Sequence, residues 1–163
     1  MSDLYRAKWS NEINDEWINA LLSNRSDLTR EQLERTRDLM NAHVRDALVE
    51  GYEDLVEIVR LPDPDDRHVV AAAIKGRADM VVTVNVRDFP ANLLERWDLE
   101  VQHPDEFLQH HFQLSPSTFL AAARTVRLRL KQPPVAIDEY LQTLEANGLV
   151  ATVGELTSFR QFM

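Results

Sequence analysis

The sequence contains no cysteine. A chain without thiols can form no disulfide, no thiolate zinc site and no cysteine nucleophile. It also lacks any apolar run near the roughly 20 residues that a membrane-spanning helix requires. Its first residues do not follow the pattern of a secretory signal peptide, in which basic residues precede apolar ones. We therefore expect a cytoplasmic protein with no membrane partner.

Basic residues are few: 18 Lys and Arg stand against 27 Asp and Glu, which gives a formal net charge of −9. Such a surplus of acid disfavours a broad electrostatic surface for nucleic acid. It remains compatible with nucleic-acid chemistry at a metal site, where bound cations meet the phosphate. The dense basic run formed by Arg124, Arg127, Arg129 and Lys131 is interpreted as a solvated helix face.

Glycine is also scarce, with 4 in 163 residues and no glycine-rich phosphate loop. The 44% hydrophobic fraction is nevertheless sufficient for a packed core. Strand and helix patterns alternate from residue 47 to residue 113, which predicts an α/β fold with a mostly parallel sheet. Residues 115–163 show helical patterns only. We therefore expect a domain over 1–114 and a helical C-terminal extension over 115–163.

Several elements can be predicted from local signals. Ser10 is expected to cap a helix over 11–22, and Thr29 with Gln32 forms a capping-box pattern for a second helix. The other expected elements are a helix from 66 to 75 ended by Gly76, strands at 47–49, 80–84 and 99–101, and helices that begin near 53, 90, 104, 116, 137 and 150, the last reaching 162.

The segment from 61 to 66, LPDPDD, places Asp63, Asp65 and Asp66 within four residues. Carboxylates this close repel one another unless a cation or protons intervene. An acidic helix cap explains one of them but explains three poorly. The predicted strand that follows ends near Thr83, Asn85 and Asp88, so both segments bring oxygen ligands to one edge of the sheet. Carboxylate oxygens are the ligands that Mg²⁺ and Mn²⁺ prefer, so the sequence predicts a site for one of these ions.

Three motifs occur in the order of a known family: Trp9-Ser10 with Glu16, then PDPDDRHVVAAAI, then VVTVNVRDFP. With this order the chain resembles the PIN-domain family over about residues 4–112, and especially the VapC-like toxins of toxin–antitoxin pairs. The stretch QPPVAIDEYLQTLEANGL is similar to C-terminal helices attached to some of these proteins. The resemblance implies a three-layer α/β/α fold with a mostly parallel sheet.

The resemblance also implies a ribonuclease in which acidic residues hold Mg²⁺ or Mn²⁺ and a metal-activated water attacks an RNA phosphodiester. It implies RNA as substrate, an antitoxin protein as a possible partner and a homodimer. The residues carried over as catalytic are Glu16, Asp66 and Asp88. The implied metal ligands are Glu16, Asp63, Asp65, Asp66, Asn85 and Asp88, with Thr83, Arg67 and Arg87 in supporting roles.

Two departures from the family pattern leave alternatives open. Asn85 stands where many relatives have an aspartate. The strand with an aspartate and the helix that usually precede the segment matching 4–9 are also missing. The chain is then a fragment, or is completed by another chain, or has a rearranged sheet. The alternative function is a catalytically impaired PIN-like domain that acts as a protein-binding or self-associating module.

Two further interpretations carry less weight. Another Mg²⁺-dependent phosphoryl-transfer fold would need a strand-borne aspartate nucleophile, and no aspartate follows an apolar strand in a suitable setting. None of the five histidines is interpreted as a metal ligand, and His68 is expected at the surface.

Overall fold

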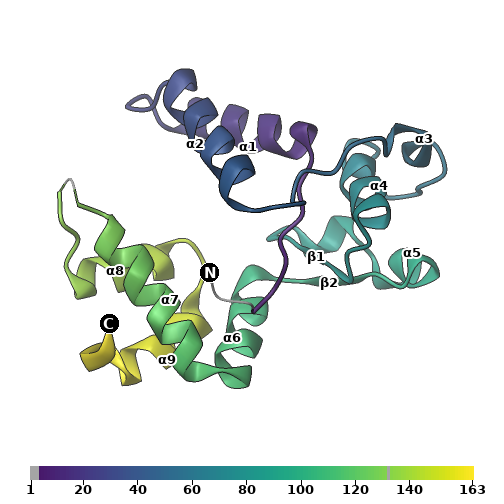
Figure 1. The fold of residues 1–163 in the computed structure, drawn as a ribbon. Helices are drawn as coiled ribbons and strands as arrows, with labels where there is room; N and C mark the ends of the chain where they lie inside the picture. Colours follow the sequence, from purple (N-terminus) through teal and green to yellow (C-terminus); the bar gives the residue numbers. More distant parts are fainter. Residues whose placement is uncertain (1–3, 132) are drawn as a thin grey trace. The chain divides into compact units, whose positions relative to one another are not determined.

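The computed structural model describes residues 4–131 and 133–163. The chain is 62% helical and contains a two-stranded parallel sheet (Figure 1). Its contacts divide it into two compact units. The first unit comprises Arg6–Val81 with Asn85–Val101, and the second comprises residues 4–5, Val82–Val84 and Gln102–Met163. Within the described residues, no helix is both long and apolar enough to cross a membrane.

The first unit begins with two capped helices. Its elements are α1 (Asn11–Asn24), α2 (Arg30–His43), α3 (Glu53–Val56), α4 (Arg67–Gly76), η1 (Val86–Asp88), α5 (Ala91–Leu94) and η2 (Glu95–Trp97). The Ser10 hydroxyl accepts a hydrogen bond from the Ile13 amide at 3.1 Å, and the capping box of Thr29 and Gln32 is complete. Both predicted caps are therefore confirmed.

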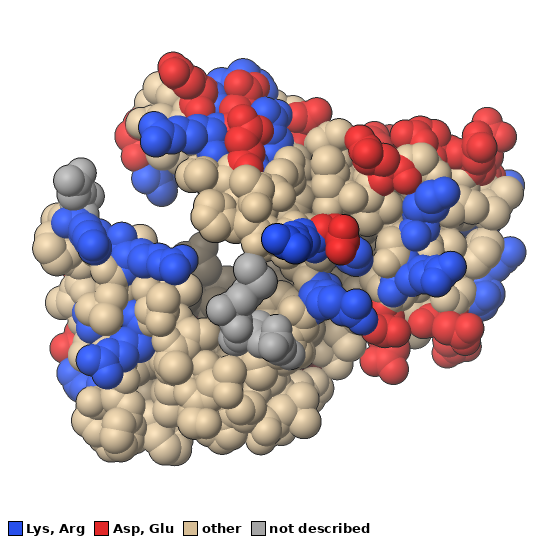
Figure 2. All heavy atoms as spheres, in the orientation of Figure 1, with Lys and Arg blue, Asp and Glu red and all other residues tan. Residues whose placement is uncertain are grey.

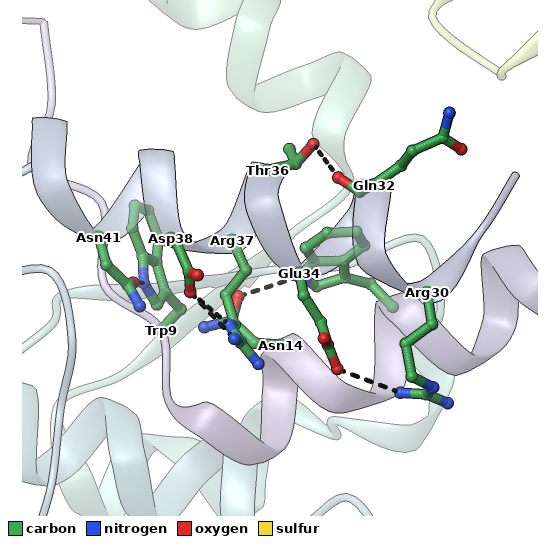
Figure 3. A network of polar contacts seen from close by, with 10 residues as sticks. Trp9, Asn14, Arg30, Gln32, Glu34, Thr36, Arg37, Asp38 and Asn41 are labelled. Carbon is green, nitrogen blue, oxygen red and sulfur yellow. Dashed lines mark hydrogen bonds and ion pairs between the residues drawn. The ribbon is translucent and has the colours of Figure 1, made fainter.

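Polar side chains connect α2 to the chain that leads into α1. The Trp9 indole Nε1 donates to Asn41 of α2 at 2.7 Å (Figure 3). Within α1, the Trp17 indole donates to Asn14 at 2.9 Å. Asn14 is buried, so its carbonyl oxygen requires such a donor. These bonds hold the start of α1 in place, which matters because α1 carries Glu12 and Glu16.

The hydrophobic core of the first unit surrounds α4. The three successive alanines of this helix, Ala71, Ala72 and Ala73, are all buried in it. Their small side chains let neighbouring segments approach the helix axis closely. The core also contains Val59, Val70, Val81, Phe89, Leu94 and Leu99.

Gly76 has a different role from the one predicted. It is the last residue of α4, and the left-handed residue that ends the helix is Arg77, with φ of 51°. A Cβ atom on Gly76 would lie 2.9 Å from the Val49 Cγ2 atom. A larger residue at 76 would therefore displace the Val49 side chain, so glycine suits this close approach.

The first strand is two residues shorter than predicted, and the second has the predicted length but is shifted by one residue. β1 is Met80–Val82 and β2 is Glu100–Gln102, and they pair in parallel. The predicted strand at 47–49 is reduced to an isolated parallel bridge between Trp9 and Leu48. The larger parallel sheet expected from the alternating pattern is therefore absent from the described residues.

The second unit is mainly helical. Its helices are α6 (Pro104–Leu114), α7 (Pro116–Arg129), α8 (Ile137–Ala146), α9 (Val150–Ser158) and η3 (Arg160–Phe162), so the helix predicted to reach 162 is interrupted after Ser158. α6 packs against α7 and α9 around a core that includes Phe112, Phe119, Leu141 and Leu156. A boundary between 114 and 115 stays a prediction.

The basic run on α7 is exposed except at one position. Arg124, Arg129 and Lys131 are exposed, whereas Arg127 is half-buried and donates to the Val135 and Met163 carbonyl oxygens at 3.1 and 2.9 Å. Over the first unit, acidic and basic side chains are interspersed on the face drawn in Figure 2. Arg127 is therefore a structural residue within a run that otherwise faces solvent.

Asp105 of α6 holds the start of α9, because its carboxylate accepts the backbone N–H groups of Ala151 and Thr152, each at 2.8 Å. Burial acts to raise the pKa of Asp105, but the hydrogen bonds from Thr152 and Ala151 outweigh it and the pKa lies below 3.8. We expect Asp105→Ala to lower the free energy of unfolding by about 1–2 kcal/mol at pH 7, as loss of a helix cap does.

The same contact predicts a pH dependence. Because the folded pKa is lowered, the stabilisation is present above the unfolded value of 3.8 and is lost as pH falls through the folded pKa. Urea unfolding at pH 7 and at pH 2 measures both effects, with the exposed Glu145→Ala as control. An equal difference between wild type and the Asp105 variant at both pH values would contradict the assignment.

Candidate metal centre

Three carboxylates converge in the first unit. Asp63, Asp66 and Asp88 each offer one oxygen, and these atoms all lie within 4.8 Å of one another. Asp63 and Asp66 belong to the turn before α4, and Asp88 ends η1, which follows β1. Asp66 and Asp88 are half-buried, whereas Asp63 is exposed. Two segments that are separate in the sequence thus form one acidic cluster, defined here by these three residues.

Local hydrogen bonds shape the turn that carries two of them. The Asp65 amide donates to the Asp63 carboxylate at 2.9 Å, and the Arg67 amide donates to the Pro64 carbonyl at 3.3 Å. Asp66 occupies the N-cap position of α4, but its side chain makes no capping hydrogen bond. Helix capping therefore does not explain this carboxylate.

The electrostatics of the cluster favour a cation. Burial raises the pKa of Asp66, and the negative charges of Asp63, Asp88 and Glu16 raise it further, while His68 acts in the opposite direction. A carboxylate in this position is stabilised by a proton or by a positive ion. The donor set of three carboxylates is the kind that hard divalent cations prefer, so it fits Mg²⁺ or Mn²⁺.

Asn85 joins the acidic cluster through Asp88. Its side-chain amide donates a hydrogen bond to the Asp88 carboxylate. This bond holds the Asp88 carboxylate, which also takes part in the acidic cluster with Asp63 and Asp66. In this arrangement Asn85 orients a charged group and adds no charge of its own.

Glu16 lies near this cluster but is bonded elsewhere. Its Oε1 atom is 2.8 Å from the His68 Nε2 atom, while the Glu12 Oε2 atom is 3.5 Å from His68 Nδ1. Its charge contributes to the raised pKa of Asp66. The Glu16 oxygens are nevertheless not among those that lie within 4.8 Å of one another.

The prediction that His68 lies at the surface is wrong. It is the second residue of α4 and is only 4% exposed. Sequence analysis missed it because burial of a histidine near a helix start depends on which side of the helix meets α1. The available signal was the spacing of Glu12 and Glu16, which places two carboxylates one helical turn apart.

A pocket of about 380 Å³ opens beside these residues. It is lined by Glu12, Glu16, Val56, Pro64, Asp65 and His68. Asp65 therefore contributes to the pocket, whereas Asp63 and Asp66 of the same turn belong to the acidic cluster. The structure thus separates the predicted ligands into two neighbouring groups.

The predicted supporting residues lie in varied environments. Thr83 belongs to the second unit, where its amide donates to the Gln102 carbonyl at 3.0 Å. Arg87, within η1, is exposed. Arg67 is half-buried, and its buried Nε atom has no hydrogen-bond partner within residues 4–131 and 133–163. Their roles stay predictions.

Comparison with known proteins gives two family matches. A model described as "PIN domain" matches residues 4–87, and one described as "VapC50 C-terminal domain" matches residues 104–158. The chain is 39% identical over 64 residues to "Putative ribonuclease VapC50" of Mycobacterium tuberculosis (strain ATCC 25618 / H37Rv). That alignment covers 39% of this chain and 37% of the relative's length. No solved structure matches.

Proposed function

Because the chain belongs to the PIN domain family, whose model matches residues 4–87, we propose that it is a metal-dependent endoribonuclease of the VapC-like toxin type. Its substrate is RNA, and its partner is an antitoxin protein that restrains it in the cytoplasm. The relative that it resembles carries the name of a ribonuclease, which supports this class of reaction. We further propose a homodimer and a three-layer α/β/α arrangement of the PIN portion.

The observation that carries the proposal is the convergence of Asp63, Asp66 and Asp88 within 4.8 Å. These carboxylates would hold Mg²⁺ or Mn²⁺, with Asn85 keeping Asp88 in position. When bound, the cation supplies positive charge to the phosphate and lowers the pKa of a water. Arg67 and Arg87 are proposed to meet neighbouring RNA phosphates.

Glu16 and Asp65 are proposed as the outer members of the same site, since both line the adjacent pocket. Glu16, Asp66 and Asp88 would then share the catalytic role, and Thr83 would support them. The raised pKa of Asp66 favours this arrangement, because the charge of Glu16 is one of its causes.

A second candidate is a binding module without catalysis. Asn85 favours it, because a neutral side chain at this point lowers the negative charge available to a cation. Such a domain would act by contacting a protein partner or a second copy of itself. The two candidates differ in their affinity for divalent ions.

Metal removal separates the candidates. We expect cleavage of single-stranded RNA with millimolar Mg²⁺ or Mn²⁺, loss of cleavage in excess EDTA, and recovery when Mn²⁺ is restored. Gel analysis of end-labelled RNA measures this, and calorimetry measures Mn²⁺ uptake. Absence of both cleavage and Mn²⁺ uptake at millimolar concentration would support the binding module. Cleavage that persists in EDTA would contradict the proposed mechanism.

A further inference from the structure

The imidazole of His68 lies between two carboxylates of α1. Its Nε2 atom is 2.8 Å from Glu16 Oε1, and its Nδ1 atom is 3.5 Å from Glu12 Oε2. An ionised carboxylate can only accept a hydrogen bond, so Nε2 is the donor to Glu16. The His68 side chain is only 5% exposed, whereas those of Glu12 and Glu16 are 56% and 54% exposed.

A hydrogen bond holds Glu12 beside the ring. The hydroxyl of the buried Tyr52 donates to the Glu12 Oε2 atom at 3.2 Å, and Ser10, which precedes α1, is buried as well. Ser10 also accepts the Ile13 amide as the cap of α1. Glu12 is thereby held against α4 by residues that are themselves buried or structural.

Among the described residues, Glu16 has no such support from a second side chain. Its carboxylate is half exposed at the end of a flexible side chain, and His68 is its one hydrogen-bond partner within the part of the chain that the structure describes. A glutamate of this kind samples several rotamers unless a neighbour holds it. The hydrogen bond to Oε1 restricts these rotamers and leaves Oε2 available to another group.

We propose that His68 is a positioning residue, which holds the Glu16 carboxylate in the orientation that a divalent cation at the acidic cluster requires. This inference rests on the proposed function. His68 touches neither substrate nor cation in this role and acts only through Glu16. Residues that orient a metal ligand commonly change metal affinity 10- to 100-fold when they are replaced.

Two substitutions of similar polarity test the hydrogen bond itself. The amide nitrogen of glutamine reaches the position of histidine Nε2, whereas asparagine reaches only the position of Nδ1. We expect His68→Asn to weaken Mn²⁺ binding by about 10- to 100-fold, and His68→Gln to stay within about threefold of wild type. Calorimetric titration of Mn²⁺ measures both, with the exposed His43→Asn on α2 as a matched control.

A double-mutant cycle shows whether His68 acts through Glu16. In a Glu16→Ala background, His68→Asn should leave Mn²⁺ affinity unchanged, because the group that it positions is gone. A loss that is equally large in both backgrounds would overturn the proposal, since it would mean a general structural role. Melting temperatures of all variants are measured alongside, and if His68→Asn fails to fold, His68→Leu is used in the same cycle.

The failure of this proposal differs from the failure of the proposed function. Wild-type protein that takes up no Mn²⁺ and cleaves no RNA would overturn both. Wild-type protein that does both, together with a His68→Asn variant that binds Mn²⁺ with wild-type affinity, would overturn only the positioning role of His68.

Discussion

Replacing Asp66 with asparagine is expected to lower metal-dependent RNA cleavage by at least about 100-fold, because this removes a half-buried charge of the cation site. The carboxylate is half-buried and lies within 4.8 Å of Asp63 and Asp88. Asparagine keeps the shape and one oxygen but removes the charge. The initial rate of cleavage of a labelled RNA at saturating Mn²⁺ measures the effect. Asp54→Asn on α3 makes the same change at an exposed position and serves as control.

The same variant should be more stable than wild type in the absence of metal. The pKa of Asp66 in the folded state is raised above its unfolded value of 3.8. At a pH between the unfolded pKa and the folded pKa, the folded state therefore binds a proton that the unfolded state has released. Stability therefore falls as pH rises through this window and stays reduced above it. The gain from asparagine should be present at pH 7 in EDTA and absent below the unfolded pKa of 3.8.

Thermal unfolding in EDTA, followed by circular dichroism at both pH values, measures this gain. A variant that cleaves RNA at the wild-type rate would refute the assignment of Asp66 to the site. A variant that is inactive but no more stable at neutral pH would show that repulsion within the acidic cluster is smaller than proposed.

Leu94→Ala is expected to lower the free energy of unfolding by about 2–5 kcal/mol, because it leaves a cavity in the core of the first unit. The Leu94 side chain is fully buried, at 0% exposure, and packs in the core around α4. Domains have total stabilities of about 5–15 kcal/mol, so a loss of this size is a large fraction of the whole.

Urea unfolding followed by circular dichroism measures the loss. The control is Leu39→Ala on α2, where the side chain is 51% exposed and the same substitution should change stability by about 0.5 kcal/mol or less. A Leu94 variant that unfolds at the same urea concentration as the Leu39 variant would contradict the packing described for this core.

The features that could be predicted from the sequence are those encoded by residues close together in it. The caps of α1 and α2 depend on Ser10, Thr29 and Gln32, which act over three residues, and both are present. The strands depend on partners far away in the chain, and β1 therefore ends at Val82 rather than at the predicted residue 84. α4 extends to Gly76, one residue beyond the predicted 75, and the close approach of Val49 to Gly76 is a tertiary contact that local sequence does not encode.

In the candidate site, too, local features could be predicted from the sequence and contacts between distant helices could not. The grouping of Asp63 and Asp66 with Asp88 could be expected, since a turn and a strand end lie at one edge of a parallel sheet. The pairing of Glu16 with His68 could not, because it depends on the rotation of α1 relative to α4. A helix start that is rich in acid gave no reason to expect a buried imidazole beside it.

The hydrogen bonds between the Asp105 carboxylate and the start of α9 indicate when this helix forms during folding. The carboxylate and the amides that it accepts are separated by 46 and 47 positions, so the bonds form only after a long loop has closed. Helices shorter than about 12–15 residues are marginal in isolation, and α9 has 9 residues. This helix should consequently become stable only once it has packed against α6.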